Sequence, residues 1–161
     1  MKDVLTCLWF DGQALEAARF YTSVFPDSRI LTQVDHPDIS PSAGTGDVMV
    51  VEFELGGRRF AGLNGGPAFP FTEAVSLQVM CEDQAEVDRY WEALTADGGQ
   101  ESQCGWLKDR YGLSWQVTPV VLTELLASAD AATAQRITAA FLPMTKLDIA
   151  TIEAAARGDG G

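Results

Sequence analysis

The sequence EAARFY at residues 16–21 returns as EVDRYW at residues 86–91, 70 positions further along the chain. Both hexapeptides lie in segments whose apolar residues recur at helical spacing. A strand pattern precedes each helix, at residues 4–10 and 75–80, and strand patterns with glycine turns follow each of them. Asp11 and Asp83 stand where the two helices would be capped. The repeat therefore predicts two modules with the same order of elements, strand–helix–strand–strand–strand, and an α+β protein.

The module limits follow from the turn signals and from a change of pattern near Pro119. We expect modules at about residues 3–66 and 74–119, which together form one tandem domain over residues 1–119. Beyond it the apolar spacing becomes helical, and Asp130 is placed to cap a helix that ends before Pro143. Residues 120–161 are therefore predicted to form a C-terminal helical extension.

Charge and cysteine usage exclude several classes of function. Lys plus Arg total 11 and Asp plus Glu total 23, a net charge of −12 that repels nucleic-acid phosphates and anionic membrane surfaces. No apolar run approaches the roughly 20 residues that span a bilayer, so we expect no membrane partner. The three cysteines form no CxxC pair, which favours reduced thiols and a cytoplasmic location. The single histidine excludes any site that needs two imidazoles from one chain.

Four segments carry a resemblance to a known family. They read LWFDGQALEAARFYTSVFPDS (residues 8–28), FELGGRRFAGLNGGPAFPF (53–71), SLQVMCEDQAEVDRYWEAL (76–94) and QCGWLKDRYGLSWQVTP (103–119). Tandem βαβββ modules with these segments resemble the vicinal oxygen chelate superfamily of glyoxalases, bleomycin-resistance proteins and dioxygenases. Within it they resemble the PhnB-like subfamily, which is often labelled as a 3-demethylubiquinone-9 3-methyltransferase domain.

The resemblance implies a fold, an assembly and a set of activities. It implies a curved, open, glyoxalase-like mixed sheet and a homodimer, and the activities of the superfamily include those of lyases and isomerases. The subfamily label adds methyl transfer. The turn between the first strand and the first helix, FDGQ at residues 10–13, holds only one glycine, so the sequence predicts no S-adenosylmethionine site and no other cofactor.

The superfamily also implies a divalent metal held by His and Glu side chains near four strand ends. Strand alternation places other residue types at those positions in this chain. Uncharged side chains of this kind bind zinc, nickel or iron poorly without anionic or imidazole partners, so we predict no metal. The corresponding positions are Leu5 or Cys7, Asn64, Ala74 or Ser76, and Gln116.

The same alternation predicts the lining of a small-molecule pocket. In the fourth strand Ala61 and Leu63 are expected to pack on a helix, which would leave Phe60, Gly62 and Asn64 facing the pocket. Aromatic walls with a few polar groups are typical of ligand sites, although the amides could instead satisfy one another in a polar interior. The predicted pocket residues are Cys7, Trp9, Asn64, Ser76, Gln78, Trp106 and Gln116.

Two residues are candidates for catalysis. Glu52 alternates with Val51 and Phe53 and would face the pocket as a general base, or else lie on a solvated strand face. Cys104 stands beside Gly105 at a strand junction, where it could be a nucleophile or a packing residue. Three hypotheses remain open: a metal-independent protein that binds an unknown small molecule, an enzyme, and a purely structural or partner-binding dimer.

Overall fold

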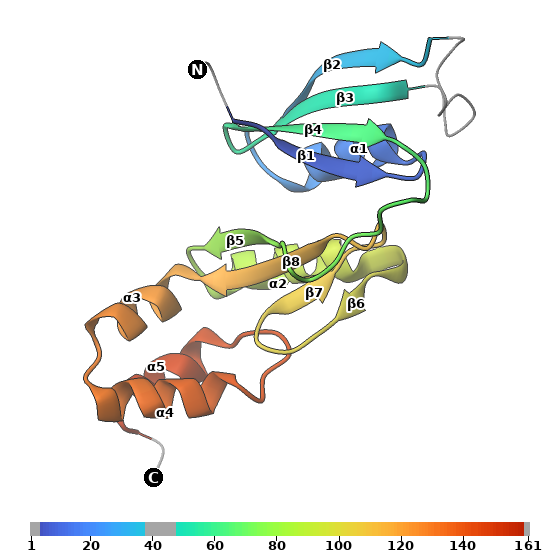
Figure 1. Ribbon diagram of the computed structural model, residues 1–161. Coiled ribbons are helices and arrows are strands. Elements are labelled where there is room, and N and C mark those ends of the chain that lie inside the picture. The colour runs from blue at the N-terminus through green and yellow to red at the C-terminus, as the bar shows by residue number, and fades with distance from the viewer. Residues whose placement is uncertain (1–3, 38–47, 160–161) are drawn as a thin grey trace. The chain divides into compact units, whose positions relative to one another are not determined.

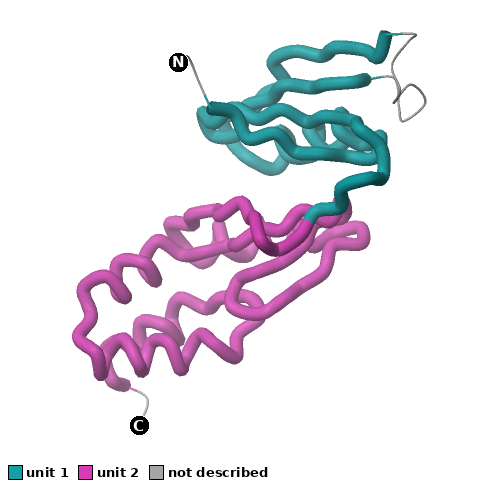
Figure 2. Tube along the Cα trace, viewed as in Figure 1, with its two compact units in different colours: residues 1–71 teal, residues 72–161 magenta. Residues whose placement is uncertain are grey.

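The chain divides into two compact units, one for each predicted module. A computed structural model describes residues 4–37 and 48–159. Contacts between residues separate Met1–Phe71 from Thr72–Gly161, shown in teal and magenta in Figure 2. The contacts place the C-terminal helices in the same unit as the second module. The separate boundary that we predicted at residue 119 stays a prediction.

Within the described residues, the first unit consists of four strands and one helix (Figure 1). β1 runs parallel to β4, and β3 pairs antiparallel with both β4 and β2, which gives the order β1-β4-β3-β2. A parallel pair needs a crossover connection, to which α1 contributes. The elements are β1 (Thr6–Phe10), α1 (Ala14–Val24), β2 (Arg29–Asp35), β3 (Val48–Leu55) and β4 (Arg58–Asn64).

The second unit repeats this arrangement. Its sheet has the order β5-β8-β7-β6, in which each strand takes the place of its counterpart in the first sheet. β5 and β8 are again the parallel pair. The repeat that the two hexapeptides predicted is therefore confirmed, and so is the α+β class. The elements are β5 (Leu77–Cys81), α2 (Gln84–Thr95), a short 3₁₀ turn η1 (Ala96–Gly98), β6 (Gln100–Glu101), β7 (Trp106–Lys108) and β8 (Ser114–Pro119).

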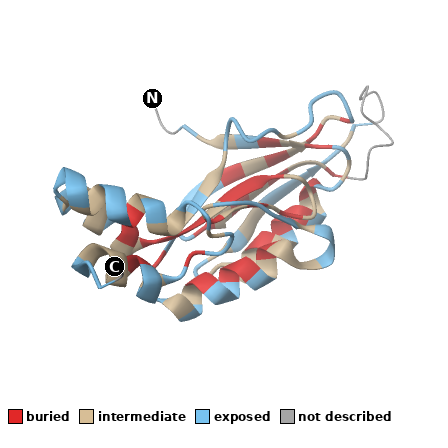
Figure 3. Ribbon diagram, turned by 90° about the horizontal axis from the view of Figure 1, so that it is seen from below, coloured by how far each residue is buried: buried red, intermediate tan, exposed pale blue. Residues whose placement is uncertain are grey.

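α1 and α2 each cover one face of the sheet in their own unit, and the core of each unit lies between its helix and its sheet. Buried residues, red in Figure 3, line one side of each helix and the strands that it covers. On α1 these include Ala17 and Tyr21, and on α2 they include Tyr90 and Leu94. The opposite face of each sheet, which α1 and α2 leave uncovered, is where a ligand could bind.

Local sequence explains where the elements turn. Gly56 and Gly57 have φ values of 50° and 81°, which suit glycine and close the β3–β4 hairpin. Asp83 caps α2 as predicted, because its side chain accepts a hydrogen bond from the Glu86 backbone N–H. The cap that we predicted at Asp11 is wrong: α1 begins after Gln13, whose side chain makes no capping bond.

Three C-terminal helices extend the second unit: α3 (Val120–Ser128), α4 (Ala131–Phe141) and α5 (Ile149–Arg157). They share a small core whose buried members are Leu122, Ile137, Leu147 and Ile152. The Asp130 side chain caps α4 as predicted.

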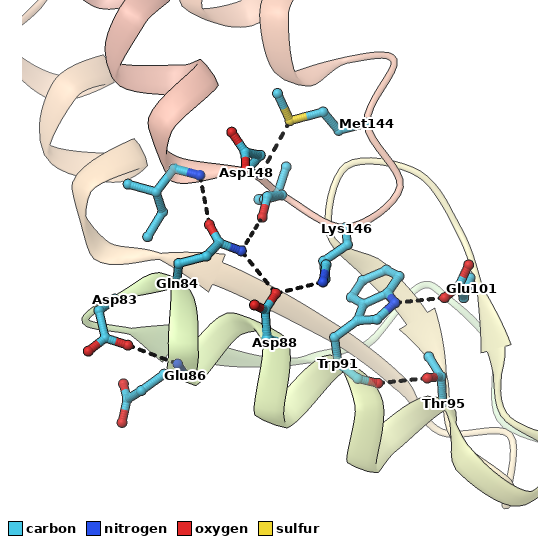
Figure 4. A network of polar contacts seen from close by, with 12 residues as sticks. Asp83, Gln84, Glu86, Asp88, Trp91, Thr95, Glu101, Met144, Lys146 and Asp148 are labelled. Atoms are coloured by element: carbon cyan, nitrogen blue, oxygen red, sulfur yellow. Dashed lines mark hydrogen bonds and ion pairs between the residues drawn. The ribbon is translucent and has the colours of Figure 1, made fainter.

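Polar contacts fasten these helices to α2 (Figure 4). The Gln84 amide donates to the Leu147 carbonyl at 3.2 Å and accepts from the Ile149 N–H at 2.9 Å. Beside it, Lys146 Nζ lies 2.6 Å from the Asp88 carboxylate. The hydrogen bond from Lys146 lowers the pKa of Asp88, so this contact persists below the ordinary carboxyl range. Across the described residues, no helix is long and apolar enough to cross a membrane.

Candidate functional site

The face of the second sheet away from α2 carries a row of polar side chains. Gln78 and Trp106 are the cross-strand partners of Gln116 on either side, so the three side chains share one rung. Gln116 Nε2 donates to Ser76 Oγ at 2.8 Å, and Gln78 Nε2 donates to Thr118 Oγ1 at 3.0 Å. The structure thus brings together Ser76, Gln78, Trp106 and Gln116. The two amides also bond to neighbouring hydroxyls, which agrees with the alternative of a polar interior.

A cavity of about 420 Å³ opens beside this row. Its size is in the range of small-molecule pockets. Trp106 supplies an aromatic wall, and Lys108 and Ser114 face each other across the β7–β8 pair. The lining residues are Glu73, Gln100, Glu101, Ser102, Trp106, Leu107, Lys108 and Ser114.

Two features of the cavity bear on binding. Lys108 Nζ lies 2.5 Å from the carboxylate of Glu73, and the hydrogen bond from Lys108 lowers the pKa of Glu73. The Ser114 hydroxyl is fully buried and has no hydrogen-bond partner among the described residues. A buried hydroxyl without a partner costs free energy, so a molecule that reached this oxygen would make a hydrogen bond that the described residues leave unmade.

A hydrogen bond to α2 fixes the position of Glu101 in the wall of the cavity. Glu101 Oε1 accepts a hydrogen bond of 2.8 Å from the indole N–H of Trp91, which is buried on α2 (Figure 4). The bond ties the short strand β6 to the helix. It also commits the Glu101 carboxylate to a protein donor.

In the first unit, the face away from α1 carries Cys7 and Trp9. Leu8 and Phe10 are buried, so their neighbours Cys7 and Trp9 lie on the other face of β1, as their predicted pocket positions require. Cys7 is exposed there. Trp9 donates from Nε1 to the Gly66 carbonyl at 2.7 Å.

The Trp9 ring fits closely over the loop after β4. It makes an edge contact with Phe69, with ring centroids 4.9 Å apart. A Cβ at Gly65 would come within 2.1 Å of the Trp9 ring, so only glycine fits beneath it. Trp9 is therefore held in one position by its loop.

The predicted faces of β4 are wrong. Phe60, Gly62 and Asn64 lie on the buried side toward α1, whereas Ala61 and Leu63 lie on the other face. The strand is shifted by one residue relative to our prediction, which exchanges its two faces. Phe60 stacks on Phe53 in the core, with ring centroids 5.5 Å apart.

Asn64 is consequently a structural residue and does not face a pocket. Its side chain is 2% exposed and lies between α1 and β3. Oδ1 accepts a 2.9 Å bond from the Ala14 N–H at the start of α1, and Nδ2 donates to the Val48 carbonyl at 2.7 Å. Asn64 performs the capping that we had assigned to Asp11.

Neither catalytic candidate stands in an activating environment. Glu52 lies on the open face as predicted, since Val51 and Phe53 are buried, but its carboxylate is 2.6 Å from Arg59 Nη2. Cys104 adopts a φ of 57°, and its thiol donates to the Leu142 carbonyl at 3.4 Å. The Cys104 N–H also bonds to the Met144 carbonyl at 2.7 Å. These contacts favour the packing interpretation of Cys104.

The residues present do not fit the divalent metal that the superfamily implies or the S-adenosylmethionine that the family label implies. Among the described residues, no three His, Cys, Asp or Glu side chains lie together as metal ligands would. Asn64, one of the four positions considered, is engaged by backbone groups. A doubly wound parallel sheet, which typically carries an S-adenosylmethionine site, is also not formed, since each described sheet has a single parallel pair.

Sequence reasoning missed the pair formed by Glu73 and Lys108. The residues are 35 positions apart, and Glu73 lies outside any strand or helix, so no periodicity connects them. Ser114 lies on the same face of β8 as Gln116, as strand alternation requires. Its lack of a partner becomes evident only from the structure.

Comparison with known proteins places these features in a family. The family model described as 3-demethylubiquinone-9 3-methyltransferase matches residues 2–118. Among solved structures, a PhnB protein from Bacillus cereus is 34% identical, with a TM-score of 0.67, and the match covers 74% of this chain and all of that one. No curated protein matches.

More distant structures share the fold alone. Protein PA1353 from Pseudomonas aeruginosa is 20% identical over 74% of this chain and 98% of its own, with a TM-score of 0.62. The fosfomycin resistance protein FosX from Mesorhizobium loti is 19% identical over 79% of this chain and 98% of its own, with a TM-score of 0.55. The repeated sheets, the match over residues 2–118 and the identity to the PhnB protein show that the chain belongs to the PhnB-like 3-demethylubiquinone-9 3-methyltransferase family of the vicinal oxygen chelate superfamily.

Proposed function

We propose that this protein binds an organic small molecule on the open face of its second sheet, without a metal ion. The observation that carries the proposal is the cavity of about 420 Å³ lined by Trp106 and by Ser114, whose buried hydroxyl has no partner in the part of the chain that the structure describes. Buried polar groups in native proteins are usually hydrogen-bonded, so an unpaired one in the lining of a cavity supports a role in binding.

The neighbouring polar residues support a binding role. Gln116 and Gln78 present amides on the same face, each held by a hydrogen bond to a hydroxyl. Fixed amides and one indole wall are suited to orienting a ligand by hydrogen bonds and stacking. The ligand-binding roles of Cys7 and Trp9 on the other sheet stay predictions, as do the homodimer and the cytoplasmic location.

Native mass spectrometry of the full chain tests the proposal. The protein is dialysed against EDTA, incubated with a small-molecule cell extract and examined for bound mass. We expect a stoichiometric organic ligand on the unaltered protein, loss of that ligand in Trp106→Ala and Gln116→Ala, and its retention in Gln135→Ala. Gln135 is an exposed glutamine on α4 and serves as the matched control.

Two results would overturn the proposal. One is the recovery of no ligand, or of a ligand that all three variants keep. The other is stoichiometric zinc, nickel, manganese or iron in the purified protein that disappears in Gln116→Ala. Light scattering on the same samples gives the mass of the assembly and checks the predicted homodimer.

A further inference from the structure

The cavity of the second unit already contains a carboxylate. Glu73 places its carboxylate oxygen 2.5 Å from Lys108 Nζ. Lys108 is the only cationic side chain among the described residues that line the cavity. The one positive charge at this site is therefore neutralised by an acidic side chain of the same unit.

Glu73 is held weakly. Its side chain is 62% exposed, it lies in a segment without regular structure, and Lys108 is 34% exposed. Ion pairs of this exposure contribute little to stability, because water screens them and both side chains lose conformational freedom. A competing anion from solution can therefore replace Glu73 at little cost.

The surroundings of Lys108 complete a binding site for an anion with an apolar body. Ser114 lies directly opposite Lys108 on β8 and offers a hydroxyl with no partner among the described residues. Trp106 lies two residues before Lys108 on β7, so its indole is on the same face. An ammonium group, a hydroxyl donor and an aromatic wall are thus adjacent.

The charge of the site selects a singly charged ligand. Glu101 also lines the cavity, and the whole chain carries a net charge of −12. A doubly charged phosphate would meet one ammonium group and a negative surrounding field. A monocarboxylate needs only one cationic partner, Lys108, which is paired with Glu73 in the absence of a ligand.

We infer that the protein binds a small organic monocarboxylate, whose carboxylate displaces Glu73 from Lys108 and accepts from Ser114 while its apolar body packs on Trp106. Glu73 thereby acts as an internal competitor that sets the affinity. The inference rests on the proposed function and names the chemical class of its ligand.

Calorimetric titration of the full chain with benzoate tests the inference, and benzamide serves as the uncharged probe of the same shape. We expect benzoate to bind at least tenfold more tightly than benzamide. In Glu73→Gln, removal of the competitor should tighten benzoate binding about two- to fivefold, in line with a weak surface ion pair. In Lys108→Met, benzoate binding should weaken at least tenfold and fall to the level of benzamide.

Matched variants separate these effects from changes in net charge or folding. Glu124→Gln removes one exposed negative charge on α3, and Lys146→Met breaks an ion pair with Asp88 of similar length and exposure. Both should leave benzoate affinity within twofold of the unaltered protein. Ser114→Ala should weaken benzoate binding and leave benzamide binding unchanged.

The inference is overturned if benzoate and benzamide bind equally, or if Lys108→Met retains full affinity for benzoate. These results leave the proposed function standing when the extract still yields a ligand that is lost in Trp106→Ala. If the extract yields no ligand while benzoate behaves as expected, the proposal of a ligand from the cell is overturned and the inference about the chemistry of the site stands. If neither experiment shows binding, the proposed function fails together with the inference.

Discussion

Asn64→Ala should destabilise the first unit strongly, because this side chain connects α1 to β3. It removes a 2.9 Å bond to the Ala14 N–H and a 2.7 Å bond to the Val48 carbonyl, at a side chain that is only 2% exposed. Each buried group left without a partner costs about 1–3 kcal/mol. Allowing for partial relaxation, we expect a loss of about 2–4 kcal/mol in the free energy of unfolding.

Hydrogen exchange of the core amides measures this loss directly. Amides of Val51 and Phe53 lie in the centre of the first sheet and exchange when its structure opens. A loss of that size accelerates their exchange roughly 30- to 1000-fold, since each 1.4 kcal/mol is a factor of ten. Gln33→Ala, which truncates an exposed amide on β2, is the control and should change exchange less than threefold.

Exchange in Asn64→Ala that accelerates less than fivefold would refute the structural role of Asn64. It would mean that water or backbone movement satisfies Ala14 and Val48 without the amide. The fold argument at β4 would then lose its main support, and the strand faces would need to be reconsidered.

Four further predictions concern other residues. Ser114→Ala should raise the free energy of unfolding by about 1 kcal/mol in urea titrations, because it removes a buried hydroxyl that no other described residue bonds; a loss would mean that the hydroxyl is satisfied. Gly65→Ala should displace the Trp9 ring and lower Tm by about 5 °C or more, with a red shift in tryptophan emission; unchanged emission would contradict the close fit. Burial raises the pKa of the Cys81 thiol to about 12, so iodoacetamide at pH 9 should label exposed Cys7 and reach Cys81 only after unfolding. Because folded Cys81 keeps a proton that the unfolded chain releases above about pH 9, its contribution to stability should decrease from there toward pH 12.

Helix and strand order could be predicted from the sequence because the repeat is strong. The matched hexapeptides and the alternation that buries Leu8 and Phe10 are local patterns, and local patterns can be recognised without knowledge of the fold. The cap at Asp83 followed in the same way from a residue type at a helix start.

The faces of β4 could not be predicted in this way, because hydrophobicity pointed to the wrong set. Ala61 and Leu63 are both apolar, whereas the alternate residues of β4 end in the polar Asn64. Hydrophobicity therefore predicts that the alternate residues face the pocket. Asn64 is buried because two backbone groups need its amide, and those groups come from distant parts of the chain. The ion pair of Glu73 with Lys108 likewise depends on a contact across 35 residues.

Backbone hydrogen bonds from the strand junction before β7 limit where the chain can be divided into fragments. The N–H groups of Cys104 and Gly105 donate to the carbonyls of Met144 and Thr145. Any fragment that stops at the end of β8 would expose both amides and strip Leu147 from its place against Gly105. Expression of the second half alone, for labelling or crystallisation, should therefore start near residue 72 and retain the chain through residue 159.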